Sequence, residues 1–372
     1  MRPERLVING RFLGQPVTGV QRVAIEFCRA LDQMLQAGEF GELDVEIVAP
    51  ATMPLVTDIQ LQRITLRRAG RTNGHLWEQM HLPWLTRQAL LLNLGNTAPL
   101  LSLLFASRRT YVMVHDLSYK YFPEAYSRAF RLIYGLIVPI VLRRARAVFT
   151  VSESERAAIL GEYPDLVDRD HIVVAQNGSP RPEGTALPDR NVRRRNCLYV
   201  GSLTKRKNAV GLVGAAIRLA REHGVTFTFV GSTADAFEEV DLKIPEDVAG
   251  RVRLIGQVNA PAALSAEYLN AAVFLFPSFY EASPLPPIEA MAHGTPVVCS
   301  RIPSLEERCG NAAVYCDPDD EDSITRATLS LLDDPVLWAE HQQAGLECAA
   351  GYSWENQARN IVRRIRDEVA AT

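Results

Sequence analysis

Short runs of β-branched and other apolar residues alternate with longer stretches of helical period along the whole chain. This alternation is typical of βα units, in which helices connect parallel strands, and it argues against a β-sandwich or a helical bundle. The sequence therefore predicts an α/β protein with doubly wound parallel sheets. We expect strands at residues 6–9, 45–49, 64–67, 90–94, 111–115, 148–152 and 172–176, and again at 197–200, 227–230, 252–255, 273–276, 297–299 and 314–316.

The chain of 372 residues is too long for one compact core and fits two domains. Residues 179–195 lack periodicity, contain three prolines and end in a basic run, which indicates an interdomain linker. We expect a Rossmann-like domain over 1–178 and a second one over 196–352. Helical sequence over about 353–372 closes the chain.

The composition excludes several classes of partner. The formal net charge of -3 argues against a general polyanion partner such as nucleic acid. The six cysteines form no CxxC pair and the seven histidines no metal-ligand motif, so we expect no metal cofactor. The N-terminus has a charged start but no apolar signal segment, so we expect a cytoplasmic location.

An apolar run over residues 132–142 is flanked by arginines and interrupted by Pro139. It is far shorter than the roughly 20 residues that span a bilayer. Its arginine flanks suit peripheral contact with an anionic membrane surface, while a buried helix with solvated arginine ends fits the pattern equally well.

A glycine and a basic loop follow the strand expected at 197–200. The run reads Gly201-Ser202-Leu203-Thr204-Lys205-Arg206-Lys207-Asn208 and leads into helical sequence. Backbone N–H groups at a helix start, with fixed cations beside them, favour a diphosphate. An exposed basic turn is the alternative for this stretch taken alone.

Two glutamates follow the strand expected at 273–276. Glu281 lies in a proline-rich loop, and Glu289 lies in the short helix that follows. Both can reach the carboxyl ends of the strands, where open α/β sheets bind ligands. A carboxylate only accepts hydrogen bonds, so each suits the hydroxyls of a ribose or a pyranose. Together with the basic loop, they indicate a binding site rather than solvated acids.

These motifs resemble those of the GT4 family of retaining glycosyltransferases, which have the GT-B fold of two Rossmann-like domains facing across a cleft. The family signature is a pair of glutamates at the spacing of Glu281 and Glu289, followed here by Ala290-Met291-Ala292-His293-Gly294-Thr295-Pro296. The likeness extends to the basic loop, to Thr18-Gly19-Val20-Gln21-Arg22, His115-Asp116 and Asn177-Gly178, and to Ser353-Trp354.

The resemblance implies roles for individual residues of the C-terminal half. Glu289 would bind the ribose of the nucleotide, and Glu281 a hydroxyl of the donor sugar. Lys207, with Arg206, would bind the diphosphate. The resemblance also implies donor-binding positions in the two loops, namely Gly201, Ser202, Ser283 and Leu285.

For the N-terminal half the resemblance implies two further roles. Gly19 would let the first loop approach the diphosphate, and His115 would lie near the transferring sugar and the acceptor. The final helix would pack back onto the N-terminal domain. Two departures from the family pattern bear on the site: Ser202 replaces a common arginine, and Pro284 has no N–H to donate to a phosphate.

The sequence thus predicts a retaining, metal-independent hexosyltransferase acting on a nucleotide-diphosphate sugar and a glycan or lipid-linked glycan. Likeness to bacterial surface-polysaccharide mannosyltransferases favours GDP-mannose as donor. Lys207, Glu281 and His115 are the expected catalytic residues. Two alternatives remain open: a GT-B sugar-nucleotide epimerase, and a non-catalytic subunit that binds a nucleotide sugar in a polysaccharide assembly complex.

Overall fold

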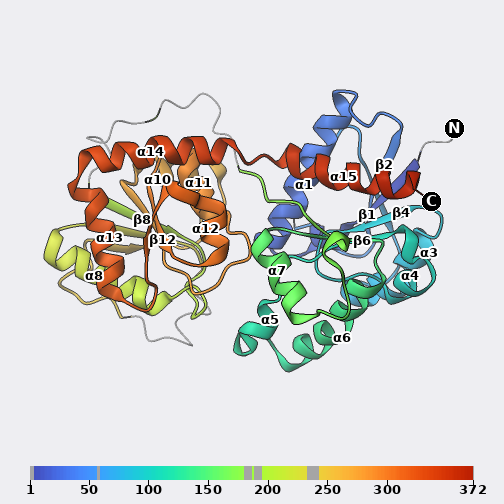
Figure 1. Cartoon of the computed structure of the whole chain (residues 1–372), viewed down its shortest axis with the longest axis horizontal. Coiled ribbons are helices and arrows are strands. Elements are labelled where there is room, and N and C mark those ends of the chain that lie inside the picture. The colour runs from blue at the N-terminus through green and yellow to red at the C-terminus, as the bar shows by residue number, and fades with distance from the viewer. Residues whose placement is uncertain (1–3, 57–58, 180–186, 188–194, 233–242, 372) are drawn as a thin grey trace. The chain divides into compact units, whose positions relative to one another are not determined.

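The computed structural model describes residues 4–56, 59–179, 187, 195–232 and 243–371, so most of the linker expected at 179–195 lies outside the described residues. The chain forms two compact units (Figure 1). The N-terminal unit comprises Met1–Gly178 and Trp354–Thr372, and the C-terminal unit comprises Ser179–Ser353.

The N-terminal unit is built on a parallel sheet in the order β3-β2-β1-β4-β5-β6-β7. The first strand lies inside the sheet, with β2 on one side and β4 on the other, as in a doubly wound fold. The strands are β1 (Glu4–Asn9), β2 (Leu43–Pro50), β3 (Thr65–Ala69), β4 (Leu90–Asn93), β5 (Thr110–Met113), β6 (Ala147–Thr150) and β7 (Ile172–Val174).

Helices connect these strands and cover the sheet (Figure 1). They are α1 (Gly19–Gln36), α2 (Gly74–Met80), α3 (Leu82–Leu85), α4 (Leu100–Phe105), α5 (Ser118–Tyr121), α6 (Arg128–Arg144) and α7 (Glu153–Glu162), with short 3-10 turns at Gly10–Gly14, Ser107–Arg109, Pro123–Ala125 and Arg169–His171. In α1 the capping box of Thr18 and Gln21 satisfies backbone donors at the start. Gly38, with a φ of 83°, follows its end.

Helix α6 contains the apolar run over residues 132–142 and continues through Pro139. Its inner face is buried through Val138, Val141 and Leu142, and this packing holds the helix across the missing N–H of the proline. Within the described residues, no helix combines the length and apolarity that crossing a bilayer requires.

The last helix, α15 (Trp354–Ala370), packs beside α1 in the N-terminal unit (Figure 1). Ile361, Val362 and Ile365 on its inner face are buried. Gln357 is buried too and donates a hydrogen bond to the carbonyl of Ala175, 3.1 Å away. The C-terminal residues of the chain therefore complete the core of the N-terminal unit.

The C-terminal unit repeats the architecture with a parallel sheet in the order β10-β9-β8-β11-β12-β13. Its strands are β8 (Asn196–Val200), β9 (Thr226–Val230), β10 (Val252–Leu254), β11 (Val273–Phe276), β12 (Val297–Ser300) and β13 (Ala313–Cys316). Its helices are α8 (Ala209–His223), α10 (Pro261–Asn270), α11 (Pro286–Ala292), α12 (Pro303–Cys309), α13 (Glu321–Asp333) and α14 (Pro335–Ala350), and a 3-10 turn lies at Gly310–Ala312.

Each sheet has one position at which the strand order reverses its direction. In the C-terminal unit the chain builds outward from β8 to β9 and β10 on one side, and the strands β11 to β13 fill the other side. The chain therefore continues from β8 towards one edge of the sheet and from β11 towards the other, and the strand order reverses between these two strands. In doubly wound sheets this is where ligands bind. In the N-terminal unit the same position lies between β1 and β4.

Candidate functional site

The loops after β8 and β11 meet at one edge of the C-terminal sheet. These strands are parallel neighbours, with Val273 paired to Cys197 and Phe274 to Leu198, so their carboxyl ends lie side by side. The loop after β8 carries Arg206 and Lys207, and the loop after β11 carries Glu281. The sheet register thus brings the basic loop and the first glutamate together.

The basic loop begins with a glycine that the local packing requires. Gly201 has a φ of 149°, and a Cβ atom built on it would lie 2.9 Å from the Tyr199 hydroxyl oxygen and 3.1 Å from Lys207 Nζ. A Cβ at Gly231, at the end of β9, would lie 2.0 Å from the Gly201 carbonyl oxygen. The two glycines therefore let backbone and lysine pack closely at the strand ends.

Asn208 joins the basic loop to α8. It adopts a left-handed conformation with a φ of 56°, and its side chain accepts a hydrogen bond from the Gly211 amide at 3.2 Å. Its Nδ2 atom donates to the Pro318 carbonyl, 2.6 Å away. This N-cap holds the loop in place, and the preference for asparagine before a helix is the signal that could have revealed it.

Glu281 forms an ion-pair cluster with the two cations. Its Oε2 atom lies 3.2 Å from Arg206 Nη1, and its Oε1 atom lies 3.6 Å from Lys207 Nζ. Arg206 Nη1 also donates to the Tyr280 carbonyl at 2.6 Å, and the Phe279 amide donates to the Arg206 carbonyl at 3.0 Å. The two loops are therefore tied together by backbone and side chains.

Burial and charge act in opposite directions on the carboxylate. Burial alone would raise the pKa of Glu281, but Lys207 and Arg206 outweigh it and lower that pKa. Burial lowers the pKa of Lys207, and Arg206 lowers it further, while Glu281 works against both. With the carboxylate ionised, two cations face one anion. The cluster therefore carries a surplus positive charge, which suits a phosphate-bearing ligand.

Glu289 lies outside this cluster, within α11. Its side chain is buried, and its Oε2 atom accepts a hydrogen bond from the hydroxyl of Tyr268 at 2.9 Å. Tyr268 belongs to α10 and is itself buried. Sequence reasoning missed Tyr268, because a tyrosine within a helix carries no sequence signal of a partner on the next helix.

The remaining positions that we expect to bind a donor lie in the same two loops. Ser202 is half-buried, and its carbonyl accepts a hydrogen bond from the Tyr199 hydroxyl at 2.9 Å. Ser283 is buried in the acidic loop. Leu285 precedes α11, and its carbonyl accepts from the Glu289 amide at 2.9 Å.

The two positions expected in the N-terminal unit have different surroundings. Gly19 is exposed at the start of α1, and a Cβ atom there would meet nothing within 4 Å. His115 follows β5 and is buried, with Nε2 donating to the Leu94 carbonyl at 2.8 Å. Burial lowers the pKa of His115, so the ring is neutral at pH 7 and bonded to backbone. Among the described residues, no group of three or more His, Cys, Asp or Glu side chains is placed to hold a metal ion.

Residues 194–334, which contain the ion-pair cluster and Glu289, match the family model described as glycosyl transferases group 1. This stretch of the C-terminal unit is similar to the group 1 glycosyl transferases. The resemblance to GT4-type glycosyltransferases that the motifs indicate is thereby confirmed. The matched stretch covers both loops of the candidate site and the strands that position them.

Two mannosyltransferases are similar to this chain. The O-antigen chain mannosyltransferase B of Escherichia coli is 34% identical over 226 residues, which cover 58% of this chain and 59% of that protein. The match therefore spans less than two thirds of the relative. An O-antigen chain mannosyltransferase of Salmonella typhimurium is 24% identical over 340 residues, covering 86% of this chain and 88% of that protein.

Among solved structures, sucrose-phosphate synthase from Thermosynechococcus elongatus resembles the chain with a TM-score of 0.72 at 20% identity, and each chain is covered completely. At this identity the likeness bears on the fold alone. With two Rossmann-like units, each on a parallel doubly wound sheet, the GT-B fold class expected from the sequence is confirmed.

Proposed function

We propose that this chain transfers a hexose from a nucleotide-diphosphate sugar to a glycan acceptor, with retention of configuration at the anomeric carbon and without a metal ion. The observation that carries the proposal is the ion-pair cluster of Arg206, Lys207 and Glu281. It lies at the strand-order reversal of a glycosyltransferase domain and has a surplus positive charge.

The chemistry needs a protein group that stabilises the leaving diphosphate. As the bond between C1 and the phosphate oxygen breaks, positive charge develops on the sugar and negative charge on the diphosphate. Lys207 and Arg206 are fixed cations that stabilise this negative charge without reorganising. The acceptor oxygen attacks C1 from the face that the diphosphate leaves, and a phosphate oxygen takes the acceptor proton.

In the proposal, the carboxylates of Glu281 and Glu289 and the imidazole of His115 position the substrate. Glu281 accepts a hydrogen bond from a hydroxyl of the donor sugar, while its ion pairs hold the two cations in place. Glu289 binds the ribose, and the hydroxyl of Tyr268 fixes the orientation of its carboxylate. His115, neutral and hydrogen-bonded to the Leu94 carbonyl, positions the transferring sugar instead of acting as a nucleophile.

GDP-mannose is the donor that we propose to test first, because both similar curated proteins reported above are mannosyltransferases. The acceptor that we propose is a glycan, free or linked to a lipid. We therefore propose that the reaction belongs to polysaccharide biosynthesis and takes place at the cytoplasmic side of the inner membrane.

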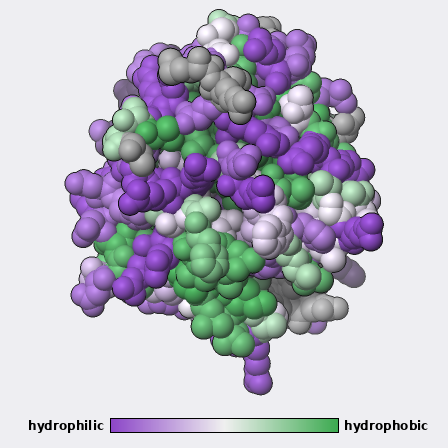
Figure 2. Space-filling view, turned by 90° about the vertical axis from the view of Figure 1, so that its right-hand side faces the viewer, coloured by the Kyte–Doolittle hydropathy of each residue, from purple (hydrophilic) through white to green (hydrophobic). Residues whose placement is uncertain are grey.

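Peripheral membrane contact is part of the proposal and rests on the surface of α4 and α6. These helices pack against each other, and they expose large apolar side chains, namely Leu101, Leu104, Phe105, Leu132, Ile133 and Leu136. Figure 2 shows hydrophobic surface gathered on this side of the N-terminal unit. Exposed arginines flank the two helices, at Arg108, Arg109, Arg128, Arg143 and Arg144. Exposed apolar side chains with arginines at the ends of their helices suit an anionic bilayer.

The test is a transfer assay with the purified chain, a panel of GDP-mannose, UDP-glucose and UDP-N-acetylglucosamine, and simple mannosides as acceptors. We expect a product whose new anomeric bond has the configuration of the donor, and an unchanged rate in EDTA. Inversion, or dependence on a metal, would contradict the mechanism. Isomerised sugar from donor alone would identify an epimerase, and tight donor binding without turnover would identify a binding subunit.

A further inference from the structure

His293 directly follows α11, in the run over residues 290–296 that carries the family resemblance, yet it has no role in the mechanism proposed above. It lies four positions after Glu289, so the two side chains leave the same face of the helix. Only 3% of His293 is exposed. A buried polar ring beside the proposed ribose-binding carboxylate is placed to act on that carboxylate.

Two hydrogen bonds fix the imidazole of His293. Its Nδ1 atom lies 2.7 Å from the backbone carbonyl oxygen of Glu289, and its Nε2 atom lies 2.9 Å from the hydroxyl oxygen of Ser265 in α10. A carbonyl oxygen only accepts, so Nδ1 carries a proton and donates. In the neutral ring, Nε2 then accepts from the Ser265 hydroxyl. Because both nitrogens are bonded, the ring cannot rotate without losing a hydrogen bond.

The fixed imidazole is stacked on the ring of Tyr268. The two ring centroids are 5.1 Å apart, and the ring planes differ by 22°. Tyr268 lies three positions after Ser265, so one face of α10 supplies both partners of His293. The Tyr268 ring also packs against Phe274 of β11, with centroids 5.7 Å apart. The orientation of the phenol ring therefore depends in part on His293.

These contacts form a closed path that begins and ends at Glu289. The Glu289 backbone carbonyl is bonded to His293, His293 is stacked on Tyr268, and the Tyr268 hydroxyl donates to Oε2 of Glu289 at 2.9 Å. The path fixes the carboxylate relative to its own backbone. Binding groups reach their ligands precisely when neighbouring packing and hydrogen bonds lock their rotamers in this way.

The turn after α11 holds the two stacked rings together. Gly294 adopts a left-handed conformation with a φ of 64°, which ends the helix directly after His293. The Thr295 amide donates to the carbonyl of Ala290 at 2.9 Å, and the Thr295 hydroxyl donates to the carbonyl of Tyr268 at 2.6 Å. The turn is thus bonded both to α11 and to α10.

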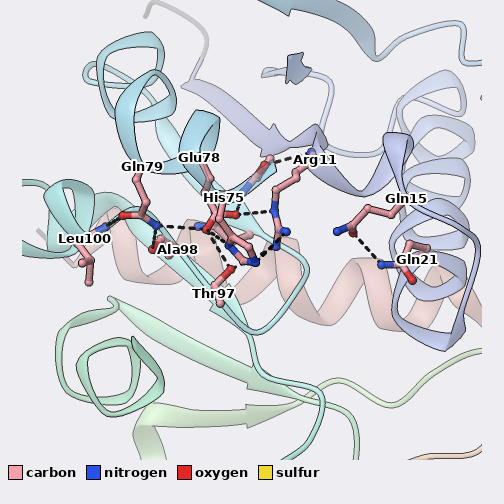
Figure 3. A network of polar contacts seen from close by, with 11 residues as sticks. Arg11, Gln15, Gln21, His75, Glu78, Gln79, Thr97, Ala98 and Leu100 are labelled. Atoms are coloured by element: carbon pink, nitrogen blue, oxygen red, sulfur yellow. Dashed lines mark hydrogen bonds and ion pairs between the residues drawn. The ribbon is translucent and has the colours of Figure 1, made fainter. Parts of the chain in front are cut away.

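Glu78, a buried carboxylate of the N-terminal unit, has a different kind of support (Figure 3). Arg11 Nε lies 2.8 Å from its Oε2 atom, and the Thr97 hydroxyl donates to its Oε1 atom at 3.0 Å. A guanidinium neutralises the carboxylate that it contacts, whereas a phenol hydroxyl orients a carboxylate and leaves its charge unchanged. The support that Tyr268 gives to Glu289 is therefore compatible with the binding of hydroxyl groups.

We infer that His293 is a positioning residue for the nucleotide, which acts through Tyr268 on Glu289 and sets the affinity for the 2′,3′-diol of the ribose. The inference rests on the proposed function, in which Glu289 binds the ribose. A vicinal diol presents two hydroxyls in a fixed geometry, so a carboxylate held in one orientation binds it better than a carboxylate free to rotate.

The experiment is calorimetric titration of the full chain with GDP and UDP and with their 2′,3′-dideoxy analogues. For the nucleotide that binds more tightly, we expect loss of the two hydroxyls to weaken binding roughly tenfold or more, because hydrogen bonds to a charged group are strong. His293→Ala should reduce this ratio at least threefold, by weakening the ribonucleotide and not its dideoxy analogue. Equal weakening of both ligands would show a merely structural role and would overturn the inference.

Two milder variants keep the test decisive if His293→Ala misfolds. His293→Asn retains an amide donor for the Glu289 carbonyl but removes the stacked ring, and it should reduce the ratio as His293→Ala does. Ser265→Ala removes the hydroxyl bonded to Nε2 and should reduce the ratio about twofold. A wild-type ratio in both variants would also overturn the inference.

Two control variants remove comparable contacts elsewhere. His341→Asn replaces a histidine of the same unit whose Nδ1 atom lies 3.0 Å from the Ala312 carbonyl oxygen. Thr97→Val removes the hydroxyl that donates to the buried Glu78 carboxylate. Both variants should keep the wild-type ratio, even where they lower the melting temperature. A reduced ratio in either control would show that general destabilisation is enough to produce the effect, against the inference.

The outcomes separate this inference from the proposed function. If a ribonucleotide binds more tightly than its dideoxy analogue and the His293 variants keep that preference, the inference alone fails. If the variants reduce the preference but the wild-type chain transfers no sugar, the proposed transfer alone fails. If neither GDP nor UDP binds, both fail.

Discussion

The Nζ atom of Lys207 lies 3.6 Å from the Oε1 atom of Glu281, although β8 and β11 deliver the two residues from distant parts of the sequence. Both side chains are mostly buried, and Arg206 contacts the second carboxylate oxygen. This cluster leads to the first prediction. Lys207→Ala should lower kcat/KM for transfer about 10²- to 10³-fold, because the variant lacks a fixed cation that stabilises the leaving diphosphate in the proposed mechanism.

Lys205→Ala is the matched control for that prediction, since Lys205 is an exposed cation of the same loop. Glu281→Ala should also reduce transfer strongly, because it removes the sugar contact of the proposed mechanism and leaves two cations without their carboxylate partner. Near-normal rates in Lys207→Ala and Glu281→Ala, on protein with a native thermal transition, would show that the cluster has no part in catalysis.

The second prediction concerns Tyr268 and Glu289, whose side chains are joined by a hydrogen bond of 2.9 Å. Tyr268→Phe should raise the KM for nucleotide sugar a few-fold, because a single hydrogen bond orienting the carboxylate contributes about 1 kcal/mol. Steady-state kinetics with varied donor measures the effect. Tyr315→Phe, which removes a hydroxyl that donates to Gly310, should leave the same KM unchanged. Equal behaviour of the two variants would contradict a role for Tyr268.

The third prediction concerns the pH dependence of the N-terminal unit. The pKa of Glu78 falls from 4.5 to about 2 on folding, since Arg11 and His75 outweigh the opposing effect of burial. The ionised carboxylate therefore stabilises the folded state above about pH 4.5, and this contribution disappears as the pH falls towards 2. A shift of this size corresponds to about 3 kcal/mol.

Hydrogen exchange of peptides from α2 measures this contribution at pH 7, 4 and 3. Glu78→Gln should increase exchange at pH 7, and the difference from wild type should shrink as the pH falls. Glu124→Gln replaces an exposed carboxylate of the same unit and serves as control. A difference that stays constant from pH 7 to pH 3 would argue that Glu78 titrates normally.

The fourth prediction tests the packing of α15 on the N-terminal unit. Ile361 is fully buried on the inner face of α15. Ile361→Ala should therefore lower the free energy of unfolding by about 2–5 kcal/mol through lost apolar contact and a residual cavity. Arg363→Ala, at an exposed position of the same helix, should have little effect. Thermal unfolding compares them, and equal melting temperatures would show that α15 contributes little.

The fifth prediction concerns the apolar surface of α4 and α6. Replacing Leu132 and Leu136 by asparagine should reduce binding to phosphatidylglycerol vesicles at least tenfold, because both side chains are more than 60% exposed, at 66% and 62%. Vesicle co-sedimentation measures binding. Val336→Asn, an exposed apolar position in the C-terminal unit, is the control. Failure of the wild-type chain to sediment with anionic vesicles would contradict membrane contact by this surface.

The sequence by itself determined the alternation of strands and helices and its restart after residue 195. Apolar periodicity and glycine positions are local signals, so the expected strands correspond to β1 to β13 within a few residues. The sequence also placed Lys207 and Glu281 at the carboxyl ends of two strands. It left open whether residues 132–142 form a buried helix or a membrane-facing segment, and the structure places them in α6, which is buried on one face and exposed at Leu132 and Leu136.

Only the tertiary structure decided which side chains meet. Strand order made β8 and β11 neighbours, and only then could Glu281 contact both cations. Glu289 accepts a hydrogen bond from Tyr268 of α10, and His115 is hydrogen-bonded to the backbone carbonyl of Leu94. A cavity beside Arg11 is formed by segments following β1, β4 and β5 together with α6. Such contacts depend on strand order and on the packing of segments far apart in sequence, and a pattern read along the chain carries neither.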